Sequence, residues 1–294
     1  MHDNTWLTEA FESHRGHLRA VAYRMLGSVS EADDAVQEAW VRMNRADTSD
    51  VENLAGWLTT VVARVCLNML RTRTARREDP LDWHVPDPII SPIERTDPEQ
   101  QALLADSVGL ALLVVLETLP PAERLAFVLH DMFAVPFDDI GPIVGRSATA
   151  ARQLASRGRR RVQGAAPAPD ADVARQRKVV DAFFAAARSG DFEALVAVLD
   201  PDAVLRSDAG PQSAASALVT GAEAIAKRAM MFAAPARVVW PALVNGAAGA
   251  LITVDGRPVS VMGFIVVDDR IVAIDALADR ERVGQLDVAG FLED

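Results

Sequence analysis

The chain is poor in the residues that build disulfides, metal sites and membrane spans. Its 294 residues include a single cysteine, Cys66, which excludes a disulfide framework and a zinc site made of cysteines. No apolar run approaches the ~18 residues that a membrane-spanning helix needs, and no apolar segment follows a basic start as in a signal peptide. We therefore expect a cytoplasmic protein with no membrane partner and no bound metal or cofactor.

Positive charge is scarce overall and concentrated locally. The net charge of −11 excludes a protein that coats nucleic acid by bulk charge. Almost all basic residues are arginines, and the first lysine is Lys178. Arginine binds phosphates and guanine edges in a bidentate way, although a GC-rich genome would produce the same bias. Two basic runs stand out: Arg64, Arg71, Arg73, Arg76 and Arg77, and then Arg146, Arg152, Arg157, Arg159, Arg160 and Arg161.

Residues 119–162 have the pattern of a helix-turn-helix. A short scaffold helix near 137–140 is followed by the turn Gly145-Arg146-Ser147, where Ser147 can cap the next helix. Arginine and glutamine on that helix can read guanine and adenine edges in a major groove. The alternative is an amphipathic helix with a solvated arginine face. The polar face comprises Thr149, Arg152, Gln153, Ser156 and Arg160.

Residues 6–77 predict three helices that end in the first basic run. Ser30 with Asp33 resembles a capping pair for the second helix. The third helix starts at Leu54 and buries an apolar stripe, and its basic end is also what the helix dipole alone would favour. The polar loop 44–53 has short side chains that can hydrogen-bond a splayed-out base or simply form turns. The polar face of the third helix comprises Thr60, Arg64, Asn68 and Arg71.

Two linkers precede a third domain of different character. Residues 78–101 are acidic and hold five prolines, which predicts an extended linker with Trp83 as an anchor. Residues 165–172 form a second linker. Helices followed by an antiparallel sheet predict an α+β domain. We expect helices at 173–188, 191–199 and 222–232, strands at 237–244, 249–254, 259–267 and 271–277, and hairpin turns at Asp255-Gly256 and Asp268-Asp269-Arg270.

Several stretches resemble one protein family. Tyr23–Ser28, Glu31–Trp40 and Gly56–Arg71 are similar in order and spacing to the first conserved domain of the extracytoplasmic-function sigma factors, small members of the sigma-70 family, and the helix-turn-helix completes the set. Residues 173–294 resemble the SnoaL-like, nuclear-transport-factor-2-like domain of one subgroup. The resemblance implies a multidomain fold, with two all-α sigma domains and a C-terminal α+β cone. Its divisions are 1–77 (region 2), 78–101 (linker), 102–164 (region 4), 165–172 (linker) and 173–294 (regulatory domain).

The resemblance also implies a function and roles for the polar faces. The partners are core RNA polymerase, through its β′ clamp helices and its β subunit, and promoter DNA, on which the protein directs transcription initiation. The face that docks on β′ would be Asp33, Asp34, Gln37 and Glu38. The −10 promoter element would be captured by loop 44–53 and the third helix, with Asn53, Thr60, Arg64, Asn68 and Arg71. The −35 element would be read by Arg146, Ser147, Thr149, Arg152, Gln153, Ser156, Arg157 and Arg160.

The motifs that connect linker and tail in this subgroup are partly kept. Leu81–Pro88 keeps the Trp and the Pro-acid-Pro of a Tyr-x-Gly-x-Trp-Leu-Pro-Glu-Pro-like motif but lacks its Tyr. Residues 279–283 are a loose match to Asn-Pro-Asp-Lys-Leu in the tail. A close match to Asp-Gly-Lys-Pro also occurs there. We expect interdomain regulation to involve Trp83 together with Asp255, Gly256, Arg257 and Pro258.

Two other functions fit parts of the sequence. A one-component regulator with a ligand-sensing tail would bind duplex DNA without polymerase. The cone fold can also enclose a small-molecule pocket, and relatives of it are cyclases and isomerases. Because no histidine follows His130 and no tyrosine follows Tyr23, such an enzyme would have to use carboxylates. Lone carboxylates are usually solvated, so we expect a regulatory or ligand-sensing module with no enzymatic activity, in which a small-molecule ligand is one option. The candidate carboxylates are Asp208, Asp255 and Asp275.

Overall fold

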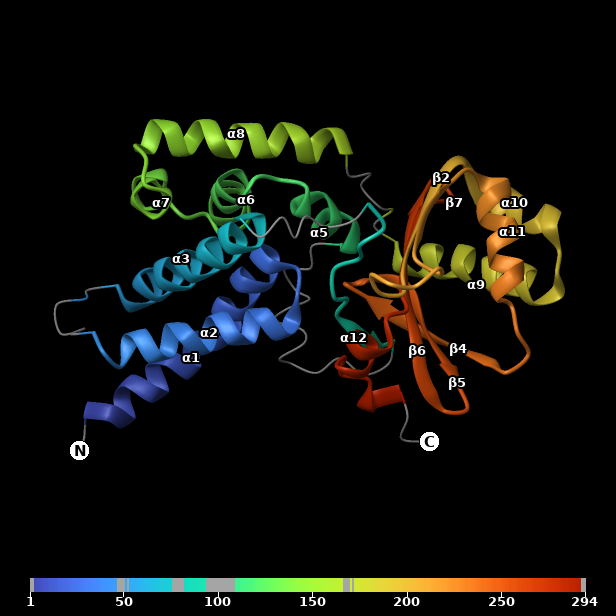
Figure 1. The fold of residues 1–294 in the computed structure, drawn as a ribbon, viewed down its shortest axis with the longest axis horizontal. Coiled ribbons are helices and arrows are strands. Elements are labelled where there is room, and N and C mark those ends of the chain that lie inside the picture. Colours follow the sequence, from blue (N-terminus) through green and yellow to red (C-terminus); the bar gives the residue numbers. More distant parts are fainter. Residues whose placement is uncertain are drawn as a thin grey trace. The chain divides into compact units, whose positions relative to one another are not determined.

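The chain folds into two compact units. The computed structural model describes residues 3–46, 51, 53–75, 82–93, 109–165, 170 and 172–291. Unit 1 holds the described residues of Met1–Asp79 and Val115–Ala165, and unit 2 those of Pro80–Val114 and Ala166–Asp294. Figure 1 shows that unit 1 is built of helices and unit 2 of a sheet with helices. Among the described helices, none combines the length and apolar composition needed to cross a bilayer.

Unit 1 contains two groups of helices that pack on one another. Helix α1 packs on α2 and α3, α6 packs on α8, and α3 contacts both α6 and α7. A short π-helical segment, η1, continues α6. The helices are α1 (Asp3–Leu26), α2 (Val29–Met43), α3 (Leu54–Ala75), α5 (Leu110–Glu117, crossing the boundary between the units), α6 (Pro121–Phe127), η1 (Val128–Met132), α7 (Phe137–Val144) and α8 (Ala148–Ala165).

A buried arginine links the two groups of helices in unit 1. The guanidinium of Arg124 in α6 donates from Nε and Nη2 to the carbonyl oxygen of Arg24 in α1, at 3.3 and 3.2 Å. Burial lowers the pKa of Arg124 to about 10. The group therefore stays charged at neutral pH. Nearby Cys66 is fully buried, and burial raises the pKa of its thiol to about 12, so it behaves as an apolar core residue.

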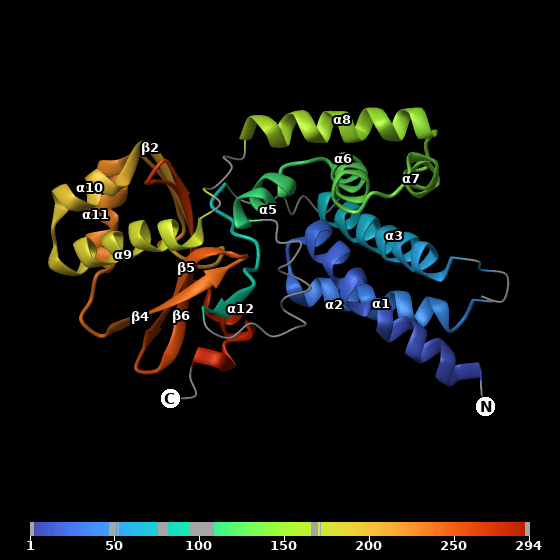
Figure 2. The ribbon, with the colours of Figure 1, turned by 180° about the vertical axis from the view of Figure 1, so that it is seen from behind.

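Unit 2 is a curved sheet with helices packed on it. Helices α9 and α11 contact the sheet, and α10 packs on both of them (Figures 1 and 2). In the described residues the strand order is β1-β4-β5-β6-β7-β2-β3. The elements are β1 (Ile90–Pro92), α9 (Val173–Ser189), α10 (Phe192–Val198), β2 (Leu199–Asp208), β3 (Ala217–Thr220), α11 (Ala222–Phe232), β4 (Arg237–Val244), β5 (Ala247–Val254), β6 (Arg257–Val267), β7 (Arg270–Leu277), α12 (Arg280–Gly284) and η2 (Ala289–Phe291).

The expected α+β character of the tail is confirmed, but the prediction of an antiparallel sheet is wrong in one respect. Strand β2, which the sequence pattern did not reveal, pairs in parallel with β7. Short β3 then pairs antiparallel with β2. The two predicted hairpin turns are present, with positive φ at Asp255, Gly256, Asp268 and Asp269, as tight two-residue turns require.

Candidate functional site

In the helix-turn-helix of unit 1, the backbone of α7 lies very close to the turn that leads into α8. Gly145 ends α7 in the left-handed region, at φ +69°. Ser147 caps α8 as expected, because its hydroxyl accepts from the backbone N–H of Ala150 at 3.2 Å. Gly141 lies under the turn: a Cβ there would be 2.8 Å from the carbonyl oxygen of Arg146. These contacts fix the angle at which α8 leaves α7.

We expect Gly141→Ala to destabilise unit 1 by about 1–3 kcal/mol, because the added methyl group has no room beneath the turn. The measurement is denaturant unfolding of the full chain followed by circular dichroism. Gly16→Ala in α1 is the matched control: a Cβ at that position meets nothing within 4 Å. Alanine should there raise the stability by about 0.5–1 kcal/mol. Equal shifts for the two variants would contradict the tight turn.

The outer face of α8 carries the predicted DNA-reading side chains. Ala151 and Ala155 on the opposite face are fully buried. The guanidinium of Arg152 lies over the ring of Phe137, 5.2 Å from its centroid, which holds this side chain at the start of the helix. The exposed residues of this face are Arg146, Ser147, Thr149, Arg152, Gln153, Ser156 and Arg160.

Other arginines of α8 turn toward unit 1 itself. Arg157, predicted to contact DNA, forms an ion pair with the buried carboxylate of Glu123 at 3.0 Å, and Arg161 approaches the same carboxylate at 3.6 Å. Arg159 donates to Asp131 at 2.7 Å. Gly158 lies between Arg157 and Arg159, where α8 packs closely on α6: a Cβ at this position would be 3.0 Å from the Phe127 side chain. The close packing explains why glycine occupies this position in the helix. This side of α8 therefore holds α6, while the Arg152 side stays open.

The polar face of α3 is largely exposed, and Asn53, the residue just before the helix, has a structural role. The side chain of Asn53 accepts from the backbone N–H of Gly56 at 3.0 Å and so caps α3. Thr60 is half-buried, and its hydroxyl donates to the Gly56 carbonyl at 3.0 Å. Arg64, Asn68 and Arg71 are exposed. Residues 47–50 and 52 of the predicted base-capturing loop, and Arg76 and Arg77, lie outside the described residues.

The predicted docking face on α2 is exposed and strongly acidic. Asp33, Asp34, Gln37 and Glu38 are all exposed. Asp33 accepts from Arg19 at 2.7 Å and Glu38 from Arg42 at 2.9 Å, both in exposed pairs. These pairs neutralise the outer acids in part.

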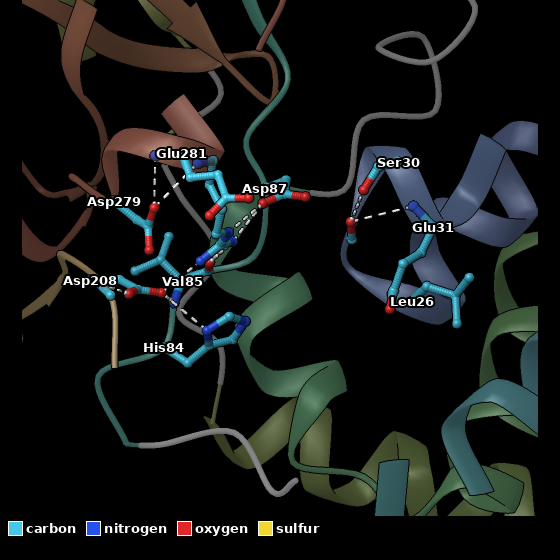
Figure 3. A network of polar contacts seen from close by, with 12 residues as sticks. Leu26, Ser30, Glu31, His84, Val85, Asp87, Asp208, Asp279 and Glu281 are labelled. Atoms are coloured by element: carbon cyan, nitrogen blue, oxygen red, sulfur yellow. Dashed lines mark hydrogen bonds and ion pairs between the residues drawn. The ribbon is translucent and has the colours of Figure 1, made fainter. Parts of the chain in front are cut away.

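The prediction of Ser30 as the cap of α2 is wrong. Ser28 is the N-cap, and its hydroxyl accepts from the backbone N–H of Glu31 at 3.5 Å (Figure 3). Gly27, at φ +73°, ends α1 immediately before this residue. The turn between the helices is thus tighter than the sequence suggested. Glu31 in the first turn of α2 also forms an ion pair with Arg73 of α3, which assigns that member of the first basic run to the fold.

In unit 2, the linker residues 82–93 are bound to the tail by what we call the linker clasp, made of Val85, Asp87, Asp208 and Arg282. Arg282 of α12 donates to Asp87 at 2.8 Å, to Asp208 at 2.7 Å and to the Val85 carbonyl at 2.6 Å. Asp208, at the end of β2, also accepts from the backbone N–H of Val85 at 3.2 Å (Figure 3). Farther along, β1 pairs antiparallel with β4.

The linker clasp changes the interpretation of two candidate carboxylates. Burial would raise the pKa of Asp208, but hydrogen bonds from His84, Val85 and Gly210 and the charge of Arg282 hold the pKa of that carboxyl below its usual value. Asp275 is also buried, which raises the pKa of its carboxyl despite the Arg206 guanidinium at 3.3 Å. The expectation that these carboxylates are solvated was wrong for both.

The residues expected to anchor the linker are not those that hold it. Trp83 is half-buried, whereas Val85 and Asp87 are buried and hydrogen-bonded. Asp255 and Gly256 form the exposed turn between β5 and β6, and Arg257 and Pro258 begin β6, where they pair with Val254 and Thr253 of β5. Among the described residues, the hydrogen bonds that hold the linker come from elsewhere. Arg282 was missed, although it lies in the loosely matched motif 279–283.

The tail also encloses a cavity of about 470 Å³ between the sheet and helices α9 and α11. Its walls are mostly apolar, and neither Asp208, Asp255 nor Asp275 lines it. The lining includes Phe183, Phe184, Leu205, Ile225, Phe232, Val239, Ile252, Met262 and Ile274, together with Arg188, Arg228, Arg237, Arg280, Ser207 and Ser260.

Comparisons with known proteins place these features in one family. Residues 10–76 match sigma-70 region 2, and residues 109–162 match sigma-70 region 4. The chain is 42% identical to the ECF RNA polymerase sigma factor SigJ of Mycobacterium tuberculosis over 220 residues, which is 74% of this chain and 70% of that protein. It is 40% identical to the probable ECF RNA polymerase sigma factor SigI of the same species over 206 residues, 69% of this chain and 70% of that protein.

A solved structure extends the similarity into the tail. The crystal structure of SigJ from Mycobacterium tuberculosis aligns with a TM-score of 0.74 at 34% identity, covering 94% of this chain and 97% of that one. The alignment therefore includes the α+β domain as well as the helical domains, and that domain has the SnoaL-like cone fold. The chain belongs to the extracytoplasmic-function sigma factors of the sigma-70 family, which bind core RNA polymerase and direct it to initiate transcription at specific promoters.

Proposed function

We propose that the two helical domains of this sigma factor divide its work among three surfaces. The exposed α2 face with Asp34 and Glu38 docks on the β′ clamp helices of core polymerase, and the region 4 domain contacts the β subunit. The α3 face with Arg64 and Asn68 holds the −10 element. The outer face of α8 reads the −35 element. The domains that carry these surfaces are residues 1–77 and 102–164, joined by the linker 78–101.

The observation that carries the −35 assignment is the division of arginines on α8. Arg157 and Arg159 pair with carboxylates of unit 1, whereas Arg152 lies on the exposed face beside Gln153. A bidentate arginine contact to guanine discriminates by ~1–3 kcal/mol. The assignment of Arg157 to DNA is the weakest of the set, because its ion pair with Glu123 would have to loosen.

We expect Arg152→Ala to reduce transcription from a promoter that the protein uses by about 10- to 100-fold, since one base contact is lost. The measurement is run-off transcription with core polymerase, repeated on templates that carry each single change in the −35 element. If Arg152 reads a base, one template change should cost the wild type as much as the substitution does, and should cost Arg152→Ala nothing more. Additive losses at every −35 position would contradict this role.

The tail, residues 173–294 after the linker 165–172, is proposed to be a regulatory, ligand-binding domain rather than an enzyme. Support comes from the cavity, whose lining contains no Asp, Glu, His, Cys, Tyr or Lys that could act as an acid or base. The carboxylate of Asp208 is instead engaged with the linker. A change in the conformation of the tail could therefore be transmitted to the helical domains through the linker 78–101, which joins those domains.

A further inference from the structure

The charged side chains around the tail cavity are all of one sign. Four lining residues are arginines and none is acidic: Arg188 of α9, Arg228 of α11, Arg237 of β4 and Arg280 of α12. Several other arginines of unit 2 are paired with carboxylates, as Arg175 is with Asp269 and Arg206 with Asp275. Among the described residues, none of the four cavity arginines forms such an ion pair. Their positive charge is therefore not neutralised by a carboxylate of unit 2 in the described residues.

Two of these arginines are held together by one aromatic ring. The guanidinium carbons of Arg228 and Arg237 lie 5.2 and 5.5 Å from the centroid of Phe232, a lining residue that is 39% exposed. Arg228 also donates to the carbonyl oxygen of Ala215. Both guanidinium groups are thus held close to the same exposed ring, at the end of α11.

The rest of the wall is apolar. It is formed by aromatic and aliphatic side chains from α9, α11 and the concave face of the sheet, among them Phe183, Phe184 and Met262. The hydroxyl of Ser207 donates to the Ala215 carbonyl, so one of the two lining serines is already used. A volume of about 470 Å³ lies in the range of pockets that take small organic molecules, ~300–1,000 Å³.

We infer that the cavity binds an apolar molecule that carries one anionic group, with its hydrocarbon part among the apolar side chains and its anion on Arg228 and Arg237. The inference rests on the proposed ligand-binding role of the tail and names the class of ligand. Guanidinium groups bind carboxylates and related oxyanions in bidentate geometry. With no acid or base in the wall, the ligand is held and not transformed.

The test compares two fluorescent probes that share a phenyl-naphthylamine skeleton: anilinonaphthalene sulfonate, which is an anion, and neutral N-phenylnaphthylamine. Both are titrated into the full chain. We expect the anion to bind at least about tenfold more tightly, as one charged contact requires. Dodecanoate should displace both probes, and dodecanol should do so far less well.

The double variant Arg228→Gln with Arg237→Gln should lose about tenfold in affinity for the anionic probe and keep its affinity for the neutral one, which also shows that the cavity is intact. Lys227→Gln is the matched control, because it removes a cation from the same helix outside the cavity lining. If the double variant binds neither probe, the single variant Arg237→Gln takes its place, because it leaves the bond from Arg228 to the Ala215 carbonyl intact. It should lose several-fold in affinity for the anionic probe and keep its affinity for the neutral one.

The outcomes separate the two levels of the proposal. Equal affinity of the wild-type chain for both probes, or an unchanged preference in the variants, overturns the inference of an anionic ligand and leaves a ligand-binding tail standing. Failure of the wild-type chain to bind either probe or dodecanoate overturns the ligand-binding role as well.

Discussion

Replacing Asp34 and Glu38 of α2 together by lysine is expected to reduce the affinity of the full chain for core RNA polymerase by more than about a hundredfold. Each residue reverses its charge, and like charges placed face to face across an interface cost several kcal/mol. Both side chains are exposed, and only Glu38 loses a partner, Arg42, in an exposed pair. The fold should therefore survive. The measurement is titration of labelled protein with core polymerase, with circular dichroism to follow the fold.

The control for that variant is Glu9→Lys with Glu12→Lys on α1. It changes the net charge by the same amount at two exposed positions outside the docking face. We expect it to bind polymerase nearly as the wild type does, apart from a weaker long-range attraction that salt screens. Unchanged affinity of the α2 variant would contradict the docking face. Binding of duplex promoter DNA without polymerase would favour a one-component regulator instead.

Replacing Arg282 by leucine is expected to destabilise unit 2 by about 3–5 kcal/mol. The substitution removes the cation that Asp208 and Asp87 share, and a buried carboxylate that loses its counter-ion is destabilised. The backbone of Val85 should then exchange its amide hydrogen faster, since its carbonyl loses the Arg282 bond and Asp208, which accepts from its N–H, loses one of its partners. Denaturant unfolding and hydrogen exchange of residues 82–93 measure the two effects.

Two further variants show whether the linker clasp acts through charge. Arg175→Leu removes the exposed pair with Asp269 in the same unit and should cost less than about 1 kcal/mol. Combining Arg282→Leu with Asp87→Leu and Asp208→Leu should recover part of the loss, because removing all members of a buried ionic group leaves no charge unpaired. A loss for Arg282→Leu no larger than for Arg175→Leu would show that the clasp contributes little.

The clasp also predicts how the stability of unit 2 depends on pH. The pKa of Asp208 is lowered in the folded chain, so its ionised form is stabilised by folding. That contribution is complete above the unfolded pKa, near 4, and is lost as the pH falls toward the lowered folded value. Asp208→Asn should flatten this acid-side slope in a series of unfolding measurements.

The sequence allowed us to predict helices and strands where apolar residues recur regularly. It did not allow us to predict the partners of isolated polar residues. Strands β4 to β7 are largely apolar runs separated by short turns with positive φ, so the signal for each strand is local. Strand β2 has Pro201 between two acids near its start, and these polar residues conceal the apolar pattern of the strand. Its parallel partner β7 lies far along the chain, and no local pattern reveals such pairing.

The same contrast applies to the functional sites: those formed within one segment could be predicted, and those formed by residues far apart in the sequence could not. The exposed face of α8 follows from helical spacing and the Ser147 cap, both of which are local. Asp87 and Arg282 are 195 residues apart in the sequence, and neither neighbourhood indicates a partner. The cavity arginines come from four different elements, so only the folded sheet brings them together. Ser28 rather than Ser30 caps α2, because α2 begins at Val29, directly after the left-handed Gly27 and its neighbour, and the acidic residue three positions after Ser30 was a misleading signal.

The three residues of β1 complete the margin of the sheet in unit 2. Ile90 pairs with Val244 and Pro92 with Ala242, and proline has no N–H to offer a further strand. Residues Ala242 to Val244 of β4 are thereby covered by a piece of the linker. Loss of this pairing would expose the main-chain amides and carbonyls of that stretch, and an exposed strand edge favours association with another chain.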